Sequence, residues 1–308
     1  MSGHVPVLLR EVSELLRPAS GKRYLDGTLG EGGHSEQILS CSEPDGQVLG
    51  LDRDDAALLA AQQRLCRFGA RLITRQASYT EAQKLLDQLG WRGVDGAILD
   101  LGVSSWQLDT PERGFSFRAT GRLDMRMDRR QELDAERIVN TYGEGELERI
   151  LRDYGEETEA RRIAQAIVAE RKINRIATTN ALAELVVRIK KSRQRDRHPA
   201  TRVFQALRIA VNQELAELER FLDNGYELLL PEGRMVVISF HSLEDRLVKT
   251  AFRKWSRACL CPPRTLRCQC GWSQKVKLLT KKPIVPLPSE ITANPRSRSA
   301  KMRAVERV

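Results

Sequence analysis

The sequence has no long apolar segment. Nowhere in its 308 residues do apolar side chains run for the roughly 18 positions that a membrane-spanning helix needs. Charged residues also interrupt the start of the chain, at Arg10, Glu11 and Glu14, where a secretory signal peptide requires an unbroken apolar stretch. We therefore expect a cytoplasmic protein with no membrane partner.

Aromatic residues and cysteines are also scarce. Phe, Trp and Tyr make up 5% of the chain, against 41% hydrophobic and 30% charged residues, a balance typical of a folded globular protein. Six cysteines are too few to hold 308 residues together by disulfides. We expect Cys41 and Cys66 to be ordinary buried thiols. The other four cysteines form a separate group.

Acidic residues are nearly absent from residues 247–308. This segment has 15 Lys and Arg but only Glu290 and Glu306 as acidic residues, which gives it a charge of +13. The rest of the chain, with 36 basic and 39 acidic residues, has a charge of −3. Such a basic segment either provides a solubilising surface or binds the phosphates of a nucleic acid.

Strand-like and helix-like segments alternate over the first hundred residues. Apolar runs predict strands at 22–27, 47–54, 70–78 and 94–102, and helices follow the first three at 35–40, 55–69 and 79–90. Mostly continuous apolar strands that alternate with helices favour a parallel, doubly wound α/β sheet.

The alternation stops after the fourth strand. From about 109 to 197 the chain is charged and mainly helical, with no convincing strand. The α/β pattern resumes with one long helix at 202–229, a strand at 233–242 and a helix at 243–255. We therefore predict a discontinuous core, 1–108 and 198–308, with an all-helical insert at 109–197.

A glycine-rich stretch follows the first strand. Gly27, Gly30, Gly32 and Gly33 lie where a doubly wound sheet brings the backbone close to a ligand. The lysine of a phosphate loop and the GxGxxG spacing of a dinucleotide site are both missing. Asp52, twenty residues after Gly32, is placed to accept hydrogen bonds from a ribose. A nucleoside without a phosphate handle indicates S-adenosylmethionine; the alternative is a tight turn followed by a helix-capping aspartate.

Long motifs in the right order resemble the MraW family, the small-subunit ribosomal RNA methyltransferases H. The resemblance covers nearly the whole chain, through "DGTLGEGGHSEQIL", "LDLGVSSWQLD", "LDMRMD", "HPATRVFQALRIAVNQEL", "GRMVVISFHSLEDRLVK" and "NPRSRSAKMRAVER". It implies a class I S-adenosylmethionine-dependent methyltransferase fold, Rossmann-like, with the helical domain inserted. It also implies methyl transfer to the N4 amine of a decoding-centre cytidine in 16S rRNA, within the 30S subunit, with no metal required; protein partners are left open.

The resemblance implies cofactor contacts from seven residues, which are Gly32, Gly33, His34, Asp52, Tyr79, Asp100 and Gln107. The glycines expose backbone, Asp52 takes the ribose, and Tyr79 covers the adenine, where the family often has Phe. Trp106 stands where the family commonly has Pro, so we do not assign it a required base-stacking role.

The residues that act on the amine are less sharply defined. Candidates are Asp100, Ser104 and Ser105 after the fourth strand and His241, with Glu244, after the fifth. An amine conjugated to a cytosine ring is a poor nucleophile, so alignment and electrostatics must lower the barrier. Our hypothesis is that Asp100 orients the amine. His241 either contacts the flipped base or only shapes its loop.

The insert is the expected RNA-recognition domain. Basic segments at 170–175 and 188–198, and a loop at 114–127 with aromatic, glycine and arginine residues, are suited to RNA. The alternative is an ordinary solvated helix surface.

Four late cysteines, Cys259, Cys261, Cys268 and Cys270, form two CxC pairs six residues apart. They are compatible with a structural metal, with reduced free thiols or with disulfides, and the usual zinc spacing is CxxC.

Three other functions share parts of this pattern. A nicotinamide-dependent oxidoreductase shares the fold but needs the missing GxGxxG. An RNA-binding or assembly protein with a vestigial pocket would not need the Gly32, Gly33, Asp52 and Asp100 set. A methyltransferase that acts on another RNA or DNA amino group is the nearest alternative.

Overall fold

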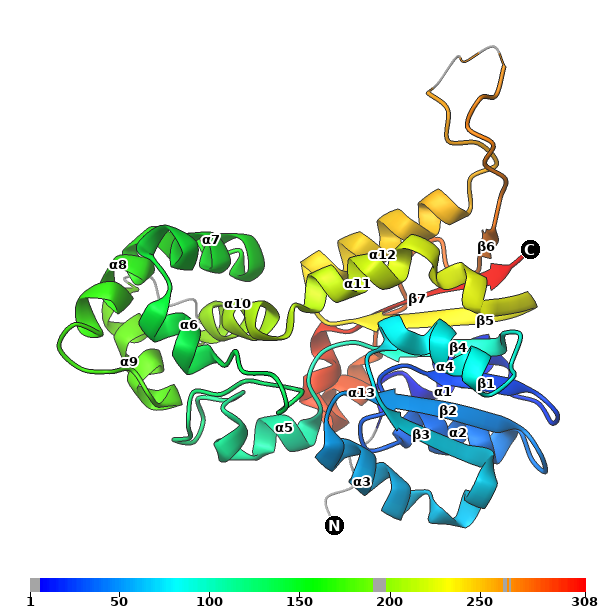
Figure 1. Ribbon diagram of the computed structural model, residues 1–308, viewed down its shortest axis with the longest axis horizontal. Coiled ribbons are helices and arrows are strands. Elements are labelled where there is room, and N and C mark those ends of the chain that lie inside the picture. The colour runs from blue at the N-terminus through cyan, green and yellow to red at the C-terminus, as the bar shows by residue number, and fades with distance from the viewer. Residues whose placement is uncertain (1–5, 191–197, 263–264, 266) are drawn as a thin grey trace. The chain divides into compact units, whose positions relative to one another are not determined.

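The computed structural model describes residues 6–190, 198–262, 265 and 267–308, and Figure 1 shows it as a ribbon. Most of the basic segment 188–198 and the first residues of the chain therefore lie outside the described part. The chain forms two compact units, which we describe separately. The core unit comprises Met1–Gly102 and Ala216–Val308, and the helical unit comprises Val103–Leu215.

The core unit is built on a seven-stranded sheet with the order β3-β2-β1-β4-β5-β7-β6. The first five strands are parallel, and β7 runs antiparallel to both β5 and β6. The strands are β1 Arg23–Asp26, β2 Gln47–Asp52, β3 Leu72–Gln76, β4 Val94–Asp100, β5 Leu229–Ser239, β6 Val276–Leu278 and β7 Lys301–Arg307. The predicted doubly wound sheet is confirmed, and its order reverses between β1 and β4, where such sheets bind ligands.

Side chains that alternate along the central strands fill two apolar layers. In β4, Ala97 and Leu99 pack on one side, while Ile98 packs on the other. Because successive strand residues point to opposite faces, the continuous apolar run of β4 requires helices on both. The core helices are α1 Leu9–Leu16, α2 Gly33–Cys41, α3 Asp55–Arg64, α4 Ala82–Gln88, α11 Glu214–Asn224, α12 Ser242–Trp255 and α13 Pro288–Ala293.

The helical unit has its own apolar core. Its helices are α5 Ser105–Asp109, α6 Ala135–Thr141, α7 Glu144–Gly155, α8 Ala160–Glu170, α9 Thr179–Ile189 and α10 Thr201–Asn212. Fully buried residues from α6 to α10, such as Ile138, Leu151, Ile167, Val186 and Leu207, form one cluster. Its described residues include no strand, only one isolated bridge between Arg122 and Thr178.

Short 3₁₀ segments complete the two units, at Cys66–Arg71, Tyr79–Glu81, Pro111–Arg113, Gly225–Leu228 and Pro295–Ser299.

The helical unit is longer than the expected 109–197. Helix α10 belongs to it because α10 packs tightly on α7: a Cβ on Gly155 would lie 2.6 Å from the carbonyl oxygen of Arg202. The single long helix expected at 202–229 is wrong. Gln213 has a left-handed φ of 51°, which ends α10 and separates it from α11.

Two further expectations fail. Cys41 and Cys66 are exposed rather than buried. Cys41 is the last residue of α2 and Cys66 lies in the 3₁₀ turn after α3, so neither points into an apolar layer. Strand β7 was also missed, because its buried Arg303 interrupts the apolar run; Arg303 donates to Asp245 at 2.7 Å.

Within the described ranges, every helix is too short or too polar to cross a bilayer.

Candidate active site

The loop after β1 lies between the ends of β2 and β4. The backbone N–H of Gly27 donates to the carbonyl of Ile98 at 3.0 Å, and that of Leu29 donates to Leu51 at 2.8 Å. A Cβ on Gly27 would lie 2.3 Å from Leu99 Cδ2. Gly32 has a φ of 80°, which side-chain-bearing residues rarely adopt. The glycines are therefore required to place this loop at the switch point.

Helix α2 begins directly after the loop. Gly32 is its N-cap and Gly33 its first residue, so the positive end of the helix dipole points toward the switch point. The absence of a side chain on Gly33 has a different cause, since a Cβ there would lie 2.3 Å from Pro6 Cγ. This end of the helix is suited to a carboxylate such as that of a methionine group.

Asp26, which the sequence analysis did not single out, ties α2 to β1. Its carboxylate accepts from Ser35 Oγ at 2.7 Å and from the backbone N–H of Thr28 at 3.2 Å. Its exposed fraction is 2%, and burial raises its pKa above the usual range, an effect that the bond from Ser35 opposes. Asp26 thus fixes the glycine loop to the start of α2.

Asp52 ends β2. One carboxylate oxygen accepts from the backbone N–H of Gly30 at 2.8 Å and the other from that of Asp54 at 2.9 Å. Loss of hydration raises the pKa of Asp52 to about 6, although these two donors favour the charged form. Each oxygen of a carboxylate can accept a second hydrogen bond, so the group still has capacity for two ribose hydroxyls.

His34 and Asp100 meet across the site. His34 Nε2 lies 3.4 Å from Asp100 Oδ2, and the exposed fraction of His34 is 7%. Neither ring nitrogen of His34, nor Oδ1 of Asp100, has a hydrogen-bond partner in the described part of the chain. A buried polar atom without a partner costs about 1–3 kcal/mol. Such atoms grouped at the switch point indicate that a polar ligand completes the site.

Asp100 is held by the glycine loop, because its backbone N–H donates to Thr28 Oγ1 at 2.6 Å. Thr28 was also missed by the sequence analysis, and its place between Gly27 and Gly30 is the only signal that could have indicated it.

Tyr79 stands beside the loop at the end of β3. Its ring meets Phe221 of α11 edge-on, with centroids 5.4 Å apart and an interplanar angle of 85°. Tyr79 Cβ would be 2.9 Å from a Cβ on Gly27, so the two residues are in close contact. Glu217 fixes this corner further, since it pairs with Arg53 and accepts from Ser78 Oγ at 2.5 Å. The ring is thereby positioned for stacking.

His241 forms the N-cap of α12, two residues after β5. Its Nδ1 accepts from the backbone N–H of Glu244 at 3.4 Å, and the Glu244 carboxylate accepts from the backbone N–H groups of Phe240 and His241 at 2.8 and 3.3 Å. This capping box engages both side chains. It supports the loop-shaping role for His241.

Ser104, Ser105 and Gln107 open the helical unit at α5. Ser104 Oγ accepts from the backbone N–H of Gln107 at 3.2 Å, and Gln107 Oε1 accepts from that of Ser104 at 3.1 Å. Gln107 is buried, whereas 38% of Trp106 is exposed. The structure thus assigns Ser104 and Gln107 to a second capping box.

The carboxyl edge of the core sheet gathers most of the expected site residues. Six of them belong to the glycine loop, α2 and the ends of β2, β3 and β4, which are Gly32, Gly33, His34, Asp52, Tyr79 and Asp100, and His241 follows β5. Ser104, Ser105 and Gln107 belong to the other unit and are not grouped with them here.

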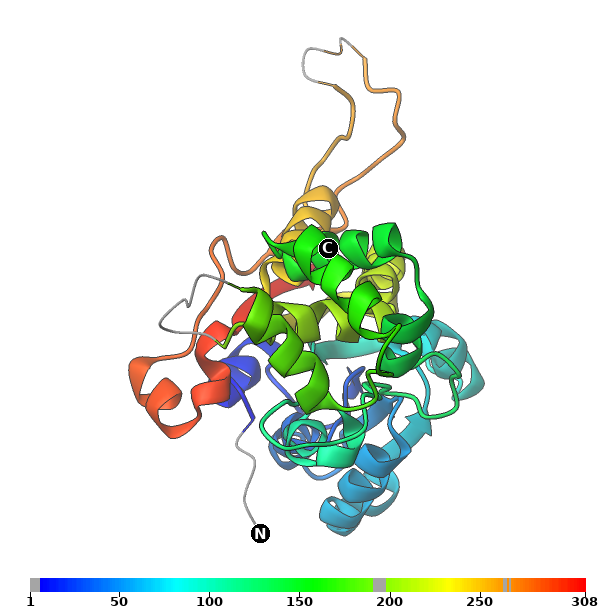
Figure 2. The ribbon, with the colours of Figure 1, turned by 90° about the vertical axis from the view of Figure 1, so that its left-hand side faces the viewer.

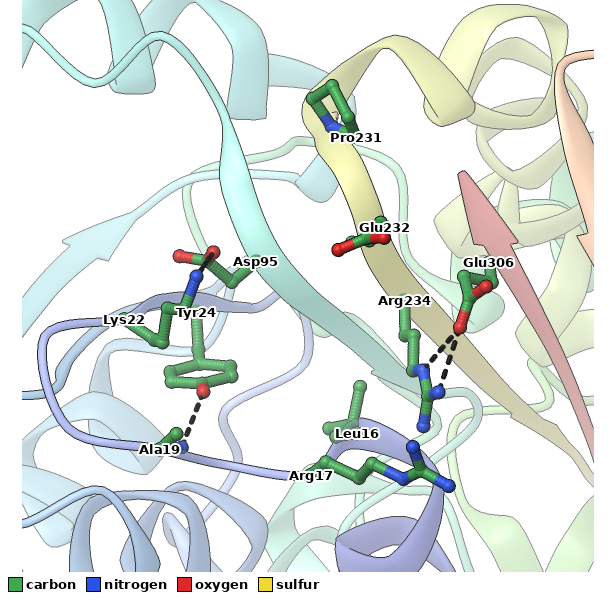
Figure 3. Close-up of a pocket in the computed structure, with 11 residues that line it drawn as sticks. Leu16, Arg17, Ala19, Lys22, Tyr24, Asp95, Pro231, Glu232, Arg234 and Glu306 are labelled. Atoms are coloured by element: carbon green, nitrogen blue, oxygen red, sulfur yellow. Dashed lines mark hydrogen bonds and ion pairs between the residues drawn. The ribbon is translucent and has the colours of Figure 1, made fainter. Parts of the chain in front are cut away.

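The opposite, amino edge of the sheet contains a cavity of about 400 Å³. Figure 3 shows two ion pairs among its charged side chains, with Lys22 2.9 Å from Asp95 and Arg234 2.8 Å from Glu306. Hydrogen bonding to Asp95 raises the pKa of Lys22. This cavity lies at the wrong edge of a doubly wound sheet for a nucleoside.

The sequence pattern that defines the MraW methylase family matches residues 1–308. The chain belongs to the MraW methylase family.

Relatives of similar length are numerous, and those named "Ribosomal RNA small subunit methyltransferase H" align end to end with this MraW methylase. The protein of Oleidesulfovibrio alaskensis is 52% identical over 311 residues, which is 100% of this chain and 96% of the relative. That of Thermomicrobium roseum is 52% identical, with 99% and 94% covered. That of Trichlorobacter lovleyi is 51% identical, with 99% and 98% covered.

As a member of the MraW family, the chain is an S-adenosylmethionine-dependent methyltransferase. The described residues fit this cofactor. Asp52 has acceptor capacity for a ribose, α2 presents its positive end, and the buried atoms of His34 and Asp100 require a polar partner. When bound there, S-adenosylmethionine supplies a methyl group on a positively charged sulfur.

Proposed function

We propose that this chain methylates the N4 amine of a decoding-centre cytidine in 16S rRNA. The observation that carries the proposal is the end-to-end match to the MraW family and to relatives named for the small ribosomal subunit. We further propose that the substrate is presented within the 30S subunit and that the protein works in the cytoplasm.

The cofactor contacts that we propose are those of the core edge together with Gln107. Gly32, Gly33 and His34 provide the start of α2 for the methionine end, and Asp52 accepts from the ribose. Tyr79 stacks on the adenine, and Phe221 helps to fix its ring through an edge-on contact with centroids 5.4 Å apart. Gln107, which is buried and whose Oε1 accepts from the backbone N–H of Ser104, is included because the family resemblance implies it.

Asp100 is the residue that we propose to orient the amine. Its Oδ1 has no partner within the described residues, and the bond from its backbone N–H to Thr28 fixes its position. A carboxylate held in this way accepts a hydrogen bond from an amino group and turns the nitrogen lone pair toward the methyl donor. Its neighbour His34, 3.4 Å away, limits the directions in which the carboxylate can turn.

Ser104, Ser105 and His241 are assigned supporting roles. Ser104 and His241 cap α5 and α12, so we propose that they shape the loops that receive the flipped base. Flipping a base costs a few kcal/mol, and polar loops recover part of that cost at its Watson–Crick edge. We propose that Ser105, which follows Ser104 in the chain, contacts the base.

The helical unit is the RNA-recognition domain that we propose. Exposed side chains of Arg118, Arg129 and Lys172 have no ion-pair partner anywhere in the described ranges. Arg126, in contrast, is bound twice by Asp124 at 2.8 Å and donates to the carbonyl of Gln131, so it folds the 114–127 loop. The unpaired cations are the ones available to phosphates.

A charge-removal pair tests this surface. Arg118→Ala should weaken binding to small subunits and lower the slope of log K against log salt by about one. Arg152→Ala is the matched control, because Arg152 is exposed on α7 but paired with Asp153 at 2.9 Å. If the slope of log K against log salt is the same for the two variants, this surface does not bind the RNA.

The decisive experiment for the function is to map the methyl group. Small subunits from a strain that lacks the activity are incubated with the protein and methyl-labelled S-adenosylmethionine, and the labelled nucleotide is identified by mass spectrometry. We expect label on the N4 of one decoding-centre cytidine. Label on an adenine, or on DNA, would show that the acceptor is a different amino group while the chain is still a methyltransferase. Absence of label on any nucleic acid would contradict the proposal.

A further inference from the structure

The segment between α12 and β6 is a long loop with no core of its own. It covers residues 256–275, and among its described residues no side chain is buried and none lies in a helix or strand. Figures 1 and 2 show it as two legs, side by side, that extend away from the end of α12. A loop of this length without apolar burial needs another source of stability if it is to hold one conformation.

The base of the loop is fixed by hydrogen bonds and one aromatic residue. The backbone N–H of Lys275 donates to the carbonyl of Trp255 at 2.8 Å, and Trp272 Nε1 donates to the carbonyl of Arg257 at 3.0 Å. The ring of Trp272 also meets Tyr226 edge-on. These contacts hold the first residues of both legs and do not extend to the residues beyond them.

Beyond the base, the two legs hold four cysteines in antiparallel register. Trp272 is opposite Arg257, Cys270 is opposite Cys259, with their Sγ atoms 3.6 Å apart, and Cys268 is opposite Cys261, at 4.0 Å. In an extended chain, residues i and i+2 point to the same side. A CxC pair on each leg therefore presents all four thiols to a common centre, which explains a spacing that differs from the CxxC of a zinc knuckle.

The distances between the sulfur atoms match a tetrahedral metal site. Cys259 and Cys268 Sγ are 3.5 Å apart, as are Cys268 and Cys270 Sγ, and all four ligand atoms lie within 4.8 Å of one another. Metal–sulfur bonds of about 2.3 Å give a tetrahedron with edges of about 3.8 Å. A disulfide needs about 2.05 Å between sulfurs. The four thiols are free, and they are too evenly spaced to form two disulfides without rearrangement.

Backbone donors also surround the sulfurs. The N–H groups of Leu260, Cys261 and Gln269 lie 3.3 Å from Cys270, Cys259 and Cys261 Sγ, respectively. Such donors stabilise the negative charge that four thiolates keep after they bind one divalent cation.

We propose that Cys259, Cys261, Cys268 and Cys270 bind one zinc ion in a closed, four-thiolate structural site. Each thiol releases its proton when it binds, and four protein ligands leave no position for water or substrate, so the site stabilises the loop and does not act in methyl transfer. The proposal stands apart from the proposed function, because the site serves the 256–275 loop.

Metal content is the direct test. The full chain is purified without a metal-affinity tag or chelator and analysed by inductively coupled plasma mass spectrometry. We expect about one zinc per chain in the wild type, and loss of at least tenfold in Cys261→Ser and Cys268→Ser. Cys41→Ser and Cys66→Ser are matched controls, because both thiols are exposed and lie outside the cluster. Iron or copper in place of zinc, or zinc that persists in both cluster variants, would overturn the proposal.

A second measurement avoids variants that fail to fold. Cobalt(II) introduced into the wild-type chain should give the strong sulfur-to-metal charge-transfer absorption and visible ligand-field bands of a tetrahedral thiolate site. Cys268→His should retain one cobalt with weaker charge transfer, because three sulfurs remain. A spectrum of octahedral cobalt in the wild type, or only two free thiols per unreduced, denatured chain, would contradict the zinc site.

Discussion

The two edges of the core sheet differ in how far their polar side chains are paired with one another. At the amino edge, Lys22 pairs with Asp95, and Arg234 pairs with Glu306 and donates to the carbonyl of Leu15 at 2.8 Å. At the carboxyl edge, both ring nitrogens of His34 and Oδ1 of Asp100 have no hydrogen-bond partner in the described part of the protein. Both edges are polar and both include a concave region or loop, so polarity alone does not distinguish them.

Single buried polar atoms without a hydrogen-bond partner also occur elsewhere in the described part of the chain, at Ser13, Trp255 and Arg307. What distinguishes the carboxyl edge is that such atoms are grouped, since His34 and Asp100 lie 3.4 Å apart at the switch point. Each buried polar atom without a hydrogen bond costs about 1–3 kcal/mol, and a bound polar ligand would remove that cost for the whole group. The following substitutions test this distinction, from the largest expected effect to the smallest.

Asp100→Asn should reduce methyl transfer about 100-fold, because removal of one oriented electrostatic group in an active site typically costs this much or more. Affinity for S-adenosylhomocysteine, measured by calorimetry, should change far less than turnover. Asp95→Asn is the control at the other edge and should leave turnover unchanged. Full turnover in Asp100→Asn with normal cofactor binding would remove Asp100 from the orienting role.

Asp52→Asn should weaken S-adenosylhomocysteine binding about 10- to 100-fold, which corresponds to loss of hydrogen bonds to a charged acceptor. The same variant should also lose stability without ligand, because an amide has only one acceptor oxygen for the two N–H groups of Gly30 and Asp54. This loss is partly offset, since burial raises the pKa of Asp52 from its ordinary value of 3.8 to about 6 and ionisation at pH 7 costs at most about 3 kcal/mol. Unchanged binding would exclude Asp52 from the ribose site.

Cofactor affinity should depend on pH through Asp52. The stabilising contribution of the protonated carboxyl is complete below about pH 4 and is lost as the pH rises through 6. Cofactor affinity should change with pH in the opposite direction to this stability term, because the ionised carboxylate is the better hydrogen-bond acceptor. Affinity should fall up to about tenfold per pH unit below 6 and level off above 7. If the affinity of Asp52→Asn, measured in parallel, does not change with pH, the pH dependence of the wild type comes from Asp52. Identical pH profiles for both proteins would contradict the assignment.

Arg234→Met should lower the free energy of unfolding by about 1–3 kcal/mol, because Glu306 and the carbonyl of Leu15 lose their donor. Urea denaturation gives this value. The affinity for S-adenosylhomocysteine should stay within twofold of the wild type, since the pair stabilises the fold at an edge that binds no cofactor. A large loss of affinity would show that the two edges are coupled.

Much of the core and its site could be predicted from the sequence. Continuous apolar strands, the glycine loop and Asp52 indicate a parallel sheet with a nucleoside at its switch point, because these signals are local. Helix breaks without glycine or proline were harder to predict. Gln213 ends α10 in a left-handed conformation that glutamine does not favour, so no local signal marks the break.

Partnerships between distant residues could not be predicted at all. The burial of Arg303 in β7 depends on Asp245, and the position of Asp100 depends on Thr28, 72 residues earlier. The capping role of Ser104 was equally hidden, and the sequence left His241 between base contact and loop shaping, because the same side chains suit catalysis and helix ends.

The split core affects how the chain folds as it is synthesised. Strand β4 ends at Asp100 and its neighbour β5 begins at Leu229, so 128 residues must emerge before the two can pair. At about 5–20 residues per second, this takes roughly 6–25 seconds on the ribosome. Throughout that interval, one side of β4 is an unpaired edge that can pair with other chains. The helical unit has its own apolar core within Val103–Leu215, so it can form during the wait.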